Sequence, residues 1–166
     1  MTLKMGLGYP TAREGLNYPI PFCDPSHLIE IATKAETFGF DSLGGNDHIV
    51  PATYISERWK KSPRYYELFT TFAHIAGLTH TIRLNTSVAV LPLRNVVWLA
   101  KQAATLDCLS DGRLILGVGV GAYPEEFSTL FPNTPLTRGI ITDHSLEALV
   151  ALLSKPSSYH SEYVEF

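Results

Sequence analysis

A histidine beside a carboxylate is the first candidate for chemistry in this sequence. His48 follows Asp47 at the end of a short apolar segment, and a long loop comes after it. An imidazole in this position could donate a hydrogen bond to a substrate oxygen or accept a proton near neutral pH. A single histidine can also be purely structural, and both interpretations stay open. The other histidines show no metal-ligand spacing such as H-x-x-x-H, so we expect no metal site.

A run of alternating glycines is the second candidate. Gly117, Gly119 and Gly121 precede Ala122 and formally fit the dinucleotide fingerprint G-x-G-x-x-G/A. That fingerprint follows a first strand and opens directly into a helix, whereas this run ends a fourth strand and leads into Tyr123-Pro124. Glycines within a strand often mark close approach of a ligand or of another backbone. We therefore favour a flat ligand lying on this strand, with plain packing as the alternative.

The elements that would position these residues alternate between strands and helices. Apolar segments predict strands at Leu3–Gly8, Phe40–Leu43, Ile82–Leu91 and Arg113–Val120. Helical spacing predicts helices over residues 25–38, 66–79, 95–109 and 138–153. We expect one loop over residues 49–64 and another around Pro124, Pro132 and Pro135.

Local signals support these boundaries. Asp24 before Pro25 indicates a helix start, and Gly39 suits the end of the same helix. Ser110-Asp111-Gly112 indicates a turn, and Cys108 is expected as a small core residue. The last predicted helix should pack through Leu146, Leu149, Val150 and Leu153.

Strands separated by helices imply parallel pairing, in either a barrel or an open doubly wound sheet. Functional residues collect beyond the carboxyl ends of the strands in both architectures. This rule selects four segments: Gly8-Tyr9-Pro10, Asn46-Asp47-His48, Thr86-Ser87-Val88 and Gly119-Val120-Gly121.

The composition is that of an ordinary globular domain, with 45% hydrophobic and 17% charged residues. The net charge of −3 gives no reason to expect nucleic acid or an anionic membrane as a partner. Two cysteines cannot form a secreted-type disulfide framework, and no long apolar run predicts a transmembrane helix. The start of the chain does not look like a signal peptide, so a cytoplasmic location is expected.

The stretch Ile82–Phe127, IRLNTSVAVLPLRNVVWLAKQAATLDCLSDGRLILGVGVGAYPEEF, closely resembles the luciferase-like monooxygenase family. The segment AETFGFDSLGGNDHIVP at Ala35–Pro51 supports this resemblance, and the tail SSYHSEYVEF is similar to a hairpin found in the family. Within the family, the chain looks most like the probable deazaflavin-dependent oxidoreductases. The resemblance covers nearly the whole sequence.

The resemblance implies a fold and a chemistry. The family fold is a TIM (β/α)₈ barrel, of which this chain would supply about four of the eight units. Residues 1–166 would then be a single domain, the N-terminal half of the barrel. Family members use FMN or coenzyme F420, a deazaflavin, for monooxygenation or hydride transfer. The expected function is therefore a flavin- or deazaflavin-dependent oxidoreductase that acts on a small organic substrate.

The resemblance also implies roles for residues. His48 would be the catalytic group that faces the reactive side of the cofactor. Ser87 and Val88 would form the bulge under the cofactor ring, joined by a non-prolyl cis peptide bond. The remaining cofactor-binding positions would be Asp47, Gly119, Gly121 and Ala122. The sequence departs from the family pattern at Gly44-Gly45, Asn85, Asp111 and His144.

Length raises an alternative function. A complete barrel needs roughly 250 residues, and this chain has 166. In the family, the cofactor phosphates are held by loops after the seventh and eighth strands. The alternative is a non-catalytic half-barrel that self-associates, without the cofactor phosphate site. Leu84, Val88, Leu114 and Leu116, or their alternates, would then face water on an apolar concave surface. We expect a homo-oligomer or a missing C-terminal half as partner.

Overall fold

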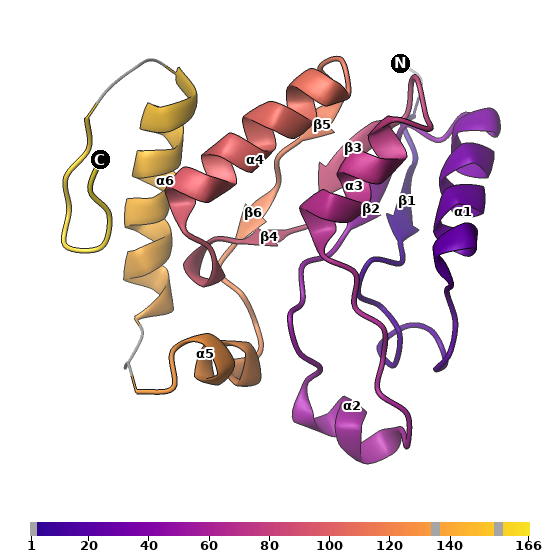
Figure 1. Ribbon diagram of the computed structural model, residues 1–166, viewed down its shortest axis with the longest axis horizontal. Helices are drawn as coiled ribbons and strands as arrows, with labels where there is room; N and C mark the ends of the chain where they lie inside the picture. Colours follow the sequence, from indigo (N-terminus) through magenta and orange to yellow (C-terminus); the bar gives the residue numbers. More distant parts are fainter. Residues whose placement is uncertain (1–2, 134–136, 155–157) are drawn as a thin grey trace.

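The computed structural model describes residues 3–133, 137–154 and 158–166 (Figure 1). The described strands are β1 (Gly6–Tyr9), β2 (Ser42–Gly45), β3 (Arg83–Thr86), β4 (Ala89–Val90), β5 (Leu114–Ile115) and β6 (Val118–Gly119). The described helices are α1 (Pro25–Thr37), α2 (Thr53–Arg58), α3 (Leu68–Ala76), the 3₁₀ helix η1 (Leu91–Leu93), α4 (Val96–Leu109), α5 (Pro124–Leu130) and α6 (Arg138–Ser154).

The order of the strands selects the barrel architecture. Four parallel strands pair in the order β1-β2-β3-β5, and β4 pairs in parallel with β6. In the larger sheet, each strand pairs with the strand of the preceding β/α unit. In a doubly wound sheet, the order of the strands would instead reverse at a switch point. The chain is a series of parallel β/α units that forms half of a TIM barrel.

One face of the sheet is covered by helices. Leu7, Leu43, Leu84 and Leu114 are partners across the four strands. All four pack into the same hydrophobic core, and Leu43 and Leu84 are fully buried. The buried side chains that α3 and α4 contribute to the same core are Leu68, Phe69, Phe72, Ile75, Ala76, Val96, Leu99, Ala100, Ala103 and Leu106.

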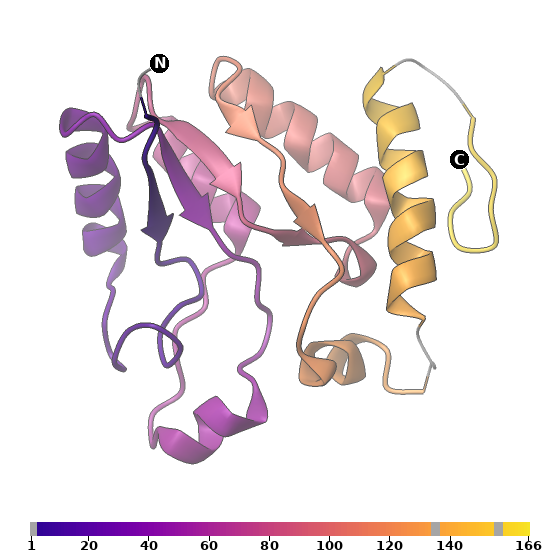
Figure 2. The same ribbon diagram turned by 180° about the vertical axis from the view of Figure 1, so that it is seen from behind.

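The opposite face of the sheet is poor in apolar side chains where the four strands pair. Gly8, Gly44, Asn85 and Ile115 are partners across the strands, and alternation turns them away from the leucines. Figure 2 shows this face in front, with α3 and α4 behind it. Of the side chains expected on an apolar concave surface, Leu84 is fully buried and Leu114 and Leu116 pack against the core, so the expectation was wrong for these three. Val88 is 39% exposed, as expected.

Two predicted strands are each broken in the middle. The predicted strand Ile82–Leu91 consists of β3 and β4, which are separated by Ser87-Val88. The predicted strand Arg113–Val120 likewise consists of β5 and β6. The second strand begins at Ser42 rather than Phe40, because the Phe40 amide closes the end of α1 by donating to the Ala35 carbonyl, 3.0 Å away.

The helix and turn signals were confirmed at several positions. Pro25 starts α1 directly after the N-cap Asp24, and Gly39 follows the helix with φ of 78°. The side chain of Asn95 caps α4 by accepting from the amides of Val97 and Trp98. In the turn that follows α4, Asp111 and Gly112 both have positive φ. Local hydrogen-bonding chemistry determines each of these boundaries.

Other expectations were wrong. The predicted loop 49–64 contains α2, and the predicted loop around Pro124 contains α5, which begins at that proline; Pro135 lies outside the described residues. Cys108 is exposed rather than in the core. Helix α6 buries Ser145, Ala148 and Leu149, whereas Leu146, Val150 and Leu153 remain partly exposed.

The C-terminal tail forms the hairpin that the sequence resemblance implied. The amide of Tyr159 donates to Phe166 O at 2.9 Å, and the amide of Phe166 donates back to Tyr159 O at 3.0 Å. Ser157, which begins the quoted tail, lies outside the described residues. Among the helices of the described ranges, none is long and apolar enough to cross a membrane.

Candidate active site

The carboxyl ends of the strands meet at one end of the molecule. Figure 1 shows α2 and α5 at the end to which the strands point. The end of β2 is held there by Asn46: its backbone N–H donates to Thr11 Oγ1 at 2.9 Å, and its side-chain amide donates to Ala12 O at 2.8 Å. The loop after β1 therefore fixes the backbone that leads into Asp47 and His48.

Asp47 is buried and ion-paired. Arg94 donates to both of its carboxylate oxygens at 2.7 Å, and the Val90 amide donates to Oδ2 at 3.1 Å. Arg94 also donates to Glu67 at 2.8 Å and lies over the ring of Phe69. Burial alone would lower the pKa of Arg94, but hydrogen bonds and charge from Asp47 and Glu67 raise it. Asp47 thus ties the end of β2 to η1, and its contact with a cofactor stays a prediction.

The break between β3 and β4 is the Ser87–Val88 segment. Its peptide bond is cis, as the resemblance implied. The Ser87 amide donates to Gly45 O at 2.6 Å, which joins this segment to the end of β2. The side chains of Ser87 and Val88 are both exposed, with Val88 at 39%. The segment is therefore fixed through its backbone and presents its side chains outward.

The glycine run packs closely against this segment. A Cβ atom on Gly117 would lie 2.3 Å from Thr86 O, and one on Gly119 would lie 2.5 Å from Val88 Cγ2. Gly121 has φ of 80°, and a Cβ there would lie 2.7 Å from Val90 Cγ1. The packing alternative thus explains the glycines by itself. Ala122 is exposed at the end of the run, and its contact with a cofactor, like that of Gly119 and Gly121, stays a prediction.

His48 lies against α5 and a group of tyrosines. Its Nδ1 is 3.1 Å from Glu126 Oε1, and its ring lies 5.0 Å from the Tyr123 ring and 6.0 Å from the Tyr65 ring, between centroids. The His48 side chain is 16% exposed, so only part of the ring is accessible. The structure gives His48 a polar partner and an aromatic wall, and its catalytic role stays a prediction.

The surroundings of His48 raise the pKa of two tyrosines, Tyr65 and Tyr123. Tyr54 and Tyr123 hydroxyls lie 3.1 Å apart. This hydrogen bond, followed by burial, raises the pKa of Tyr123 to about 12. Burial, with the nearby Tyr123 and Tyr54, also raises the pKa of Tyr65. These groups can donate or accept hydrogen bonds near neutral pH without carrying charge.

Sequence reasoning missed Glu126, Tyr65 and Tyr123. A signal for Glu126 was present, because Pro124 followed by two acidic residues is typical of a first helical turn. Nothing in the sequence placed that turn next to His48, which is 78 residues away. Within the described ranges, no group of three or more His, Cys, Asp or Glu side chains is arranged to hold a metal ion.

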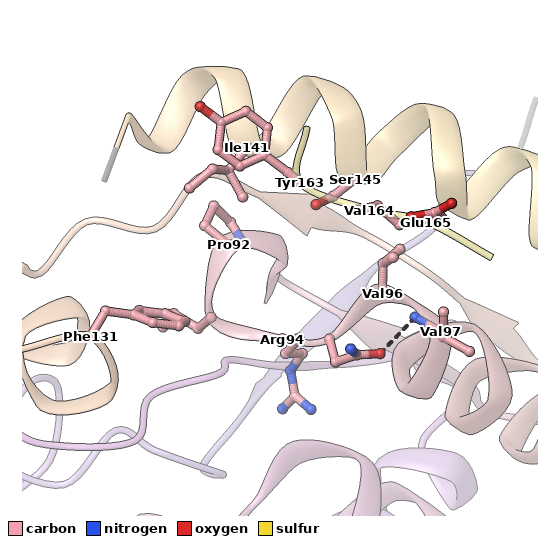
Figure 3. A pocket seen from close by; sticks show the side chains of 12 residues that line it. Pro92, Arg94, Val96, Val97, Phe131, Ile141, Ser145, Tyr163, Val164 and Glu165 are labelled. Carbon is pink, nitrogen blue, oxygen red and sulfur yellow. Dashed lines mark hydrogen bonds between the residues drawn. The ribbon is translucent and has the colours of Figure 1, made fainter. Parts of the chain in front are cut away.

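A separate cavity of about 550 Å³ lies between η1, α4, α6 and the C-terminal hairpin. Figure 3 shows Pro92, Phe131 and Ile141 around it, with the Arg94 guanidinium pointing away. None of the predicted site residues lines this cavity, so it is distinct from the candidate active site.

Comparison with known proteins identifies the family. The model of the luciferase-like monooxygenases matches residues 5–166, and the chain belongs to this family. A curated relative, an F420-dependent glucose-6-phosphate dehydrogenase of Rhodococcus erythropolis, is 30% identical over 133 residues. That match covers 79% of this chain and 35% of the relative, so the chain corresponds to about a third of the relative's length.

Solved structures agree on the fold. The FMN complex of the oxygenating constituent of 3,6-diketocamphane monooxygenase, from Pseudomonas putida, aligns with a TM-score of 0.80 at 21% identity. It covers 100% of this chain and 44% of its own. An F420-dependent secondary alcohol dehydrogenase aligns with a TM-score of 0.77 at 20% identity, covering 99% of this chain and 47% of its own.

Proposed function

We propose that this chain is the half-barrel of a flavin- or deazaflavin-dependent oxidoreductase that contacts the reactive ring of the cofactor. The observation that carries the proposal is the exposed Ser87–Val88 segment, held by backbone hydrogen bonds at the carboxyl ends of the strands. It lies beside the end of β2, which continues into Asp47 and His48. Functional groups of parallel barrels collect at this end.

The residues at this end fit a flat, ring-shaped group. Gly8 and Gly44 add no side chains of their own to the adjacent face of the sheet, although the Arg13 guanidinium lies over Gly8. No helix of the described chain covers this face (Figure 2). Val88 offers an apolar support for a ring, and the Ser87 hydroxyl offers a hydrogen bond. When bound, a flavin or deazaflavin would supply hydride transfer, or monooxygenation in the presence of dioxygen.

The proposed cofactor is FMN or F420. The curated relative is named for F420, whereas the Pseudomonas putida structure contains FMN. We propose that His48 faces the reactive side of the ring and exchanges a proton with a small organic substrate. Asp47, Gly119, Gly121 and Ala122 would complete the surroundings of the cofactor, and the protein would function in the cytoplasm.

A titration with FMN and with F420, followed by absorbance and fluorescence, tests the proposal. Val88→Arg should abolish binding by placing a charged chain where the ring would lie. Val97→Arg is the matched control, because Val97 is a valine of α4 with similar exposure, 41%. Failure of the wild-type protein to bind either cofactor, or equal binding by both variants, would contradict the proposal.

Open sheet edges favour a second candidate, the non-catalytic half-barrel that self-associates. Among the described strands, β1 pairs only with β2, and β5 pairs only with β3. Unpaired edges offer backbone groups to another chain. Sedimentation velocity distinguishes the candidates: a dimer or larger oligomer without cofactor binding supports the second, and a monomer that binds FMN or F420 tightly excludes it.

A further inference from the structure

Glu126 is a carboxylic acid with no exposed surface. Its Oε1 lies 3.1 Å from His48 Nδ1 and accepts a hydrogen bond from the Ile49 amide at 3.0 Å. Its Oε2 is buried without a hydrogen-bond partner in the described part of the chain. Buried carboxylates are costly unless they are paired, so the place of Glu126 beside the candidate catalytic histidine calls for a functional explanation.

We propose that Glu126 is a positioning residue for His48. It holds the imidazole with the proton on Nδ1, so that Nε2 is the nitrogen that accepts a proton from the substrate or returns it. This inference rests on the proposed function for the role of His48, and on the hydrogen bonds of Glu126 for the state of the ring.

The Ile49 amide determines which group donates. An amide N–H can only donate, so the Oε1 that receives it acts as an acceptor. The same oxygen faces Nδ1, and two acceptors facing each other would repel. If Glu126 is ionised, as we propose, Oε1 has no hydrogen to donate to Nδ1. Nδ1 then carries the hydrogen, which leaves the lone pair of a neutral ring on Nε2.

The charge of Glu126 supports the same role. In the described ranges, His48 is the only side chain placed to form an ion pair with Glu126, and the contact is ionic only when the imidazole is protonated. The other titratable groups near His48 are tyrosines: Tyr65 and Tyr123 lie against the ring, and Tyr54 bonds to Tyr123. When Nε2 takes a proton, the pair changes from net −1 to net zero, and the imidazolium compensates the buried carboxylate.

Helix α5 holds this arrangement in place through two consecutive glutamates. Glu126 accepts from Ile49, and Glu125 accepts from the amide and the hydroxyl of Thr53 at 2.7 Å and 2.6 Å. Glu125 does not contact His48, although it lies on the same helical turn and has the same side chain. It is therefore a matched control for a purely structural role of this turn.

Nitrogen-15 NMR of the imidazole rings tests the proposal without cofactor or substrate. At a pH where the wild-type ring is neutral, His48 should show a protonated Nδ1 and an unprotonated Nε2. Glu126→Leu should redistribute the proton between the two nitrogens, whereas Glu125→Leu should leave it on Nδ1. A wild-type ring with its proton on Nε2, or a folded Glu126→Leu protein with an unchanged ring, would overturn the proposal.

Glu126→Gln covers the case in which the leucine variant fails to fold. Its amide oxygen can still accept from Ile49 and His48, so the ring should keep the proton on Nδ1 while the charge is lost. Loss of that proton position in a folded glutamine variant would overturn the proposal. In the cofactor-loaded enzyme, Glu126→Gln should lower kcat more than it changes KM. Absence of cofactor binding would refute the proposed function and leave the NMR result intact.

Discussion

Replacing Gly117 by alanine tests whether a glycine is needed there for the close contact with the backbone of Thr86 at the end of β3. The new Cβ would lie 2.3 Å from Thr86 O, and real Cβ atoms essentially never approach below 3.0 Å. The obstructing atom belongs to the backbone, so no side-chain rotation can relieve the contact, and the strands must separate.

The expected effect is a net loss of stability. Overpacking of this kind costs about 1–3 kcal/mol, and the lower entropy of the unfolded alanine chain offsets about 0.4–1 kcal/mol. Gly117→Ala should therefore reduce the free energy of unfolding by about 1.3 kcal/mol, taking the middle of both ranges. It should also weaken cofactor binding, because Gly117 O accepts from the Ala89 amide and from Thr86 Oγ1 on either side of Ser87-Val88.

Gly139→Ala is the control for this substitution. Gly139 lies in the first turn of α6, and a Cβ there meets nothing within 4 Å. The same change should stabilise the protein there by about 0.4–1 kcal/mol. Urea denaturation of both variants measures the difference. Equal or greater stability of Gly117→Ala relative to the wild type would refute the packing explanation.

Three further predictions concern catalysis, the core and acid stability. His48→Ala should leave the protein folded, although Glu126 loses its histidine partner, and should lower turnover of the loaded enzyme by about 10²–10⁴-fold. Full activity would remove His48 from the catalytic role. Arg113→Met should lower the free energy of unfolding, measured by urea denaturation, by on the order of 3 kcal/mol, because it leaves buried carbonyls without their donor. Arg83→Met is the control and should lower it by less than about 1 kcal/mol. An equally small loss for Arg113→Met would contradict the prediction. Burial opposes ionisation of Glu36, but amide hydrogen bonds from residues 80–82 lower its pKa from 4.5 to about 2. The contribution of Glu36 to stability should therefore be present above pH 4.5 and be lost as the pH falls toward 2. Glu36→Gln should flatten that part of the profile of stability against pH, measured by thermal melts.

The sequence predicted those parts of the fold that depend on local chemistry. Asp24, Gly39 and Asn95 act through hydrogen bonds or backbone angles within a few residues, and their elements were predicted correctly. Helices α2 and α5, with six and seven residues, are too short for helical periodicity to show. The two helices contact each other through Thr53 and Glu125, and no local pattern reveals this contact.

The candidate site was predictable only through family resemblance. The resemblance indicated the Ser87–Val88 peptide, whose neighbours are ordinary strand formers. It did not indicate Glu126, because the importance of that residue arises from a contact across 78 positions. The apolar face of the last helix was also misjudged, since the surroundings of α6 bury Ala148 and expose Val150.

The two glutamates of α5 allow the packing of that helix against residues 49–53 to be followed at single backbone amides. The amides of Ile49 and Thr53 donate to side chains of α5 and not to their own neighbours in the chain. Hydrogen exchange at these two amides therefore requires α5 to separate from the loop, so both should exchange together with the amides of α5. The exchange rates of the Ile49 and Thr53 amides thus report whether the loop after β2 and helix α5, which are far apart in sequence, open as one cooperative unit.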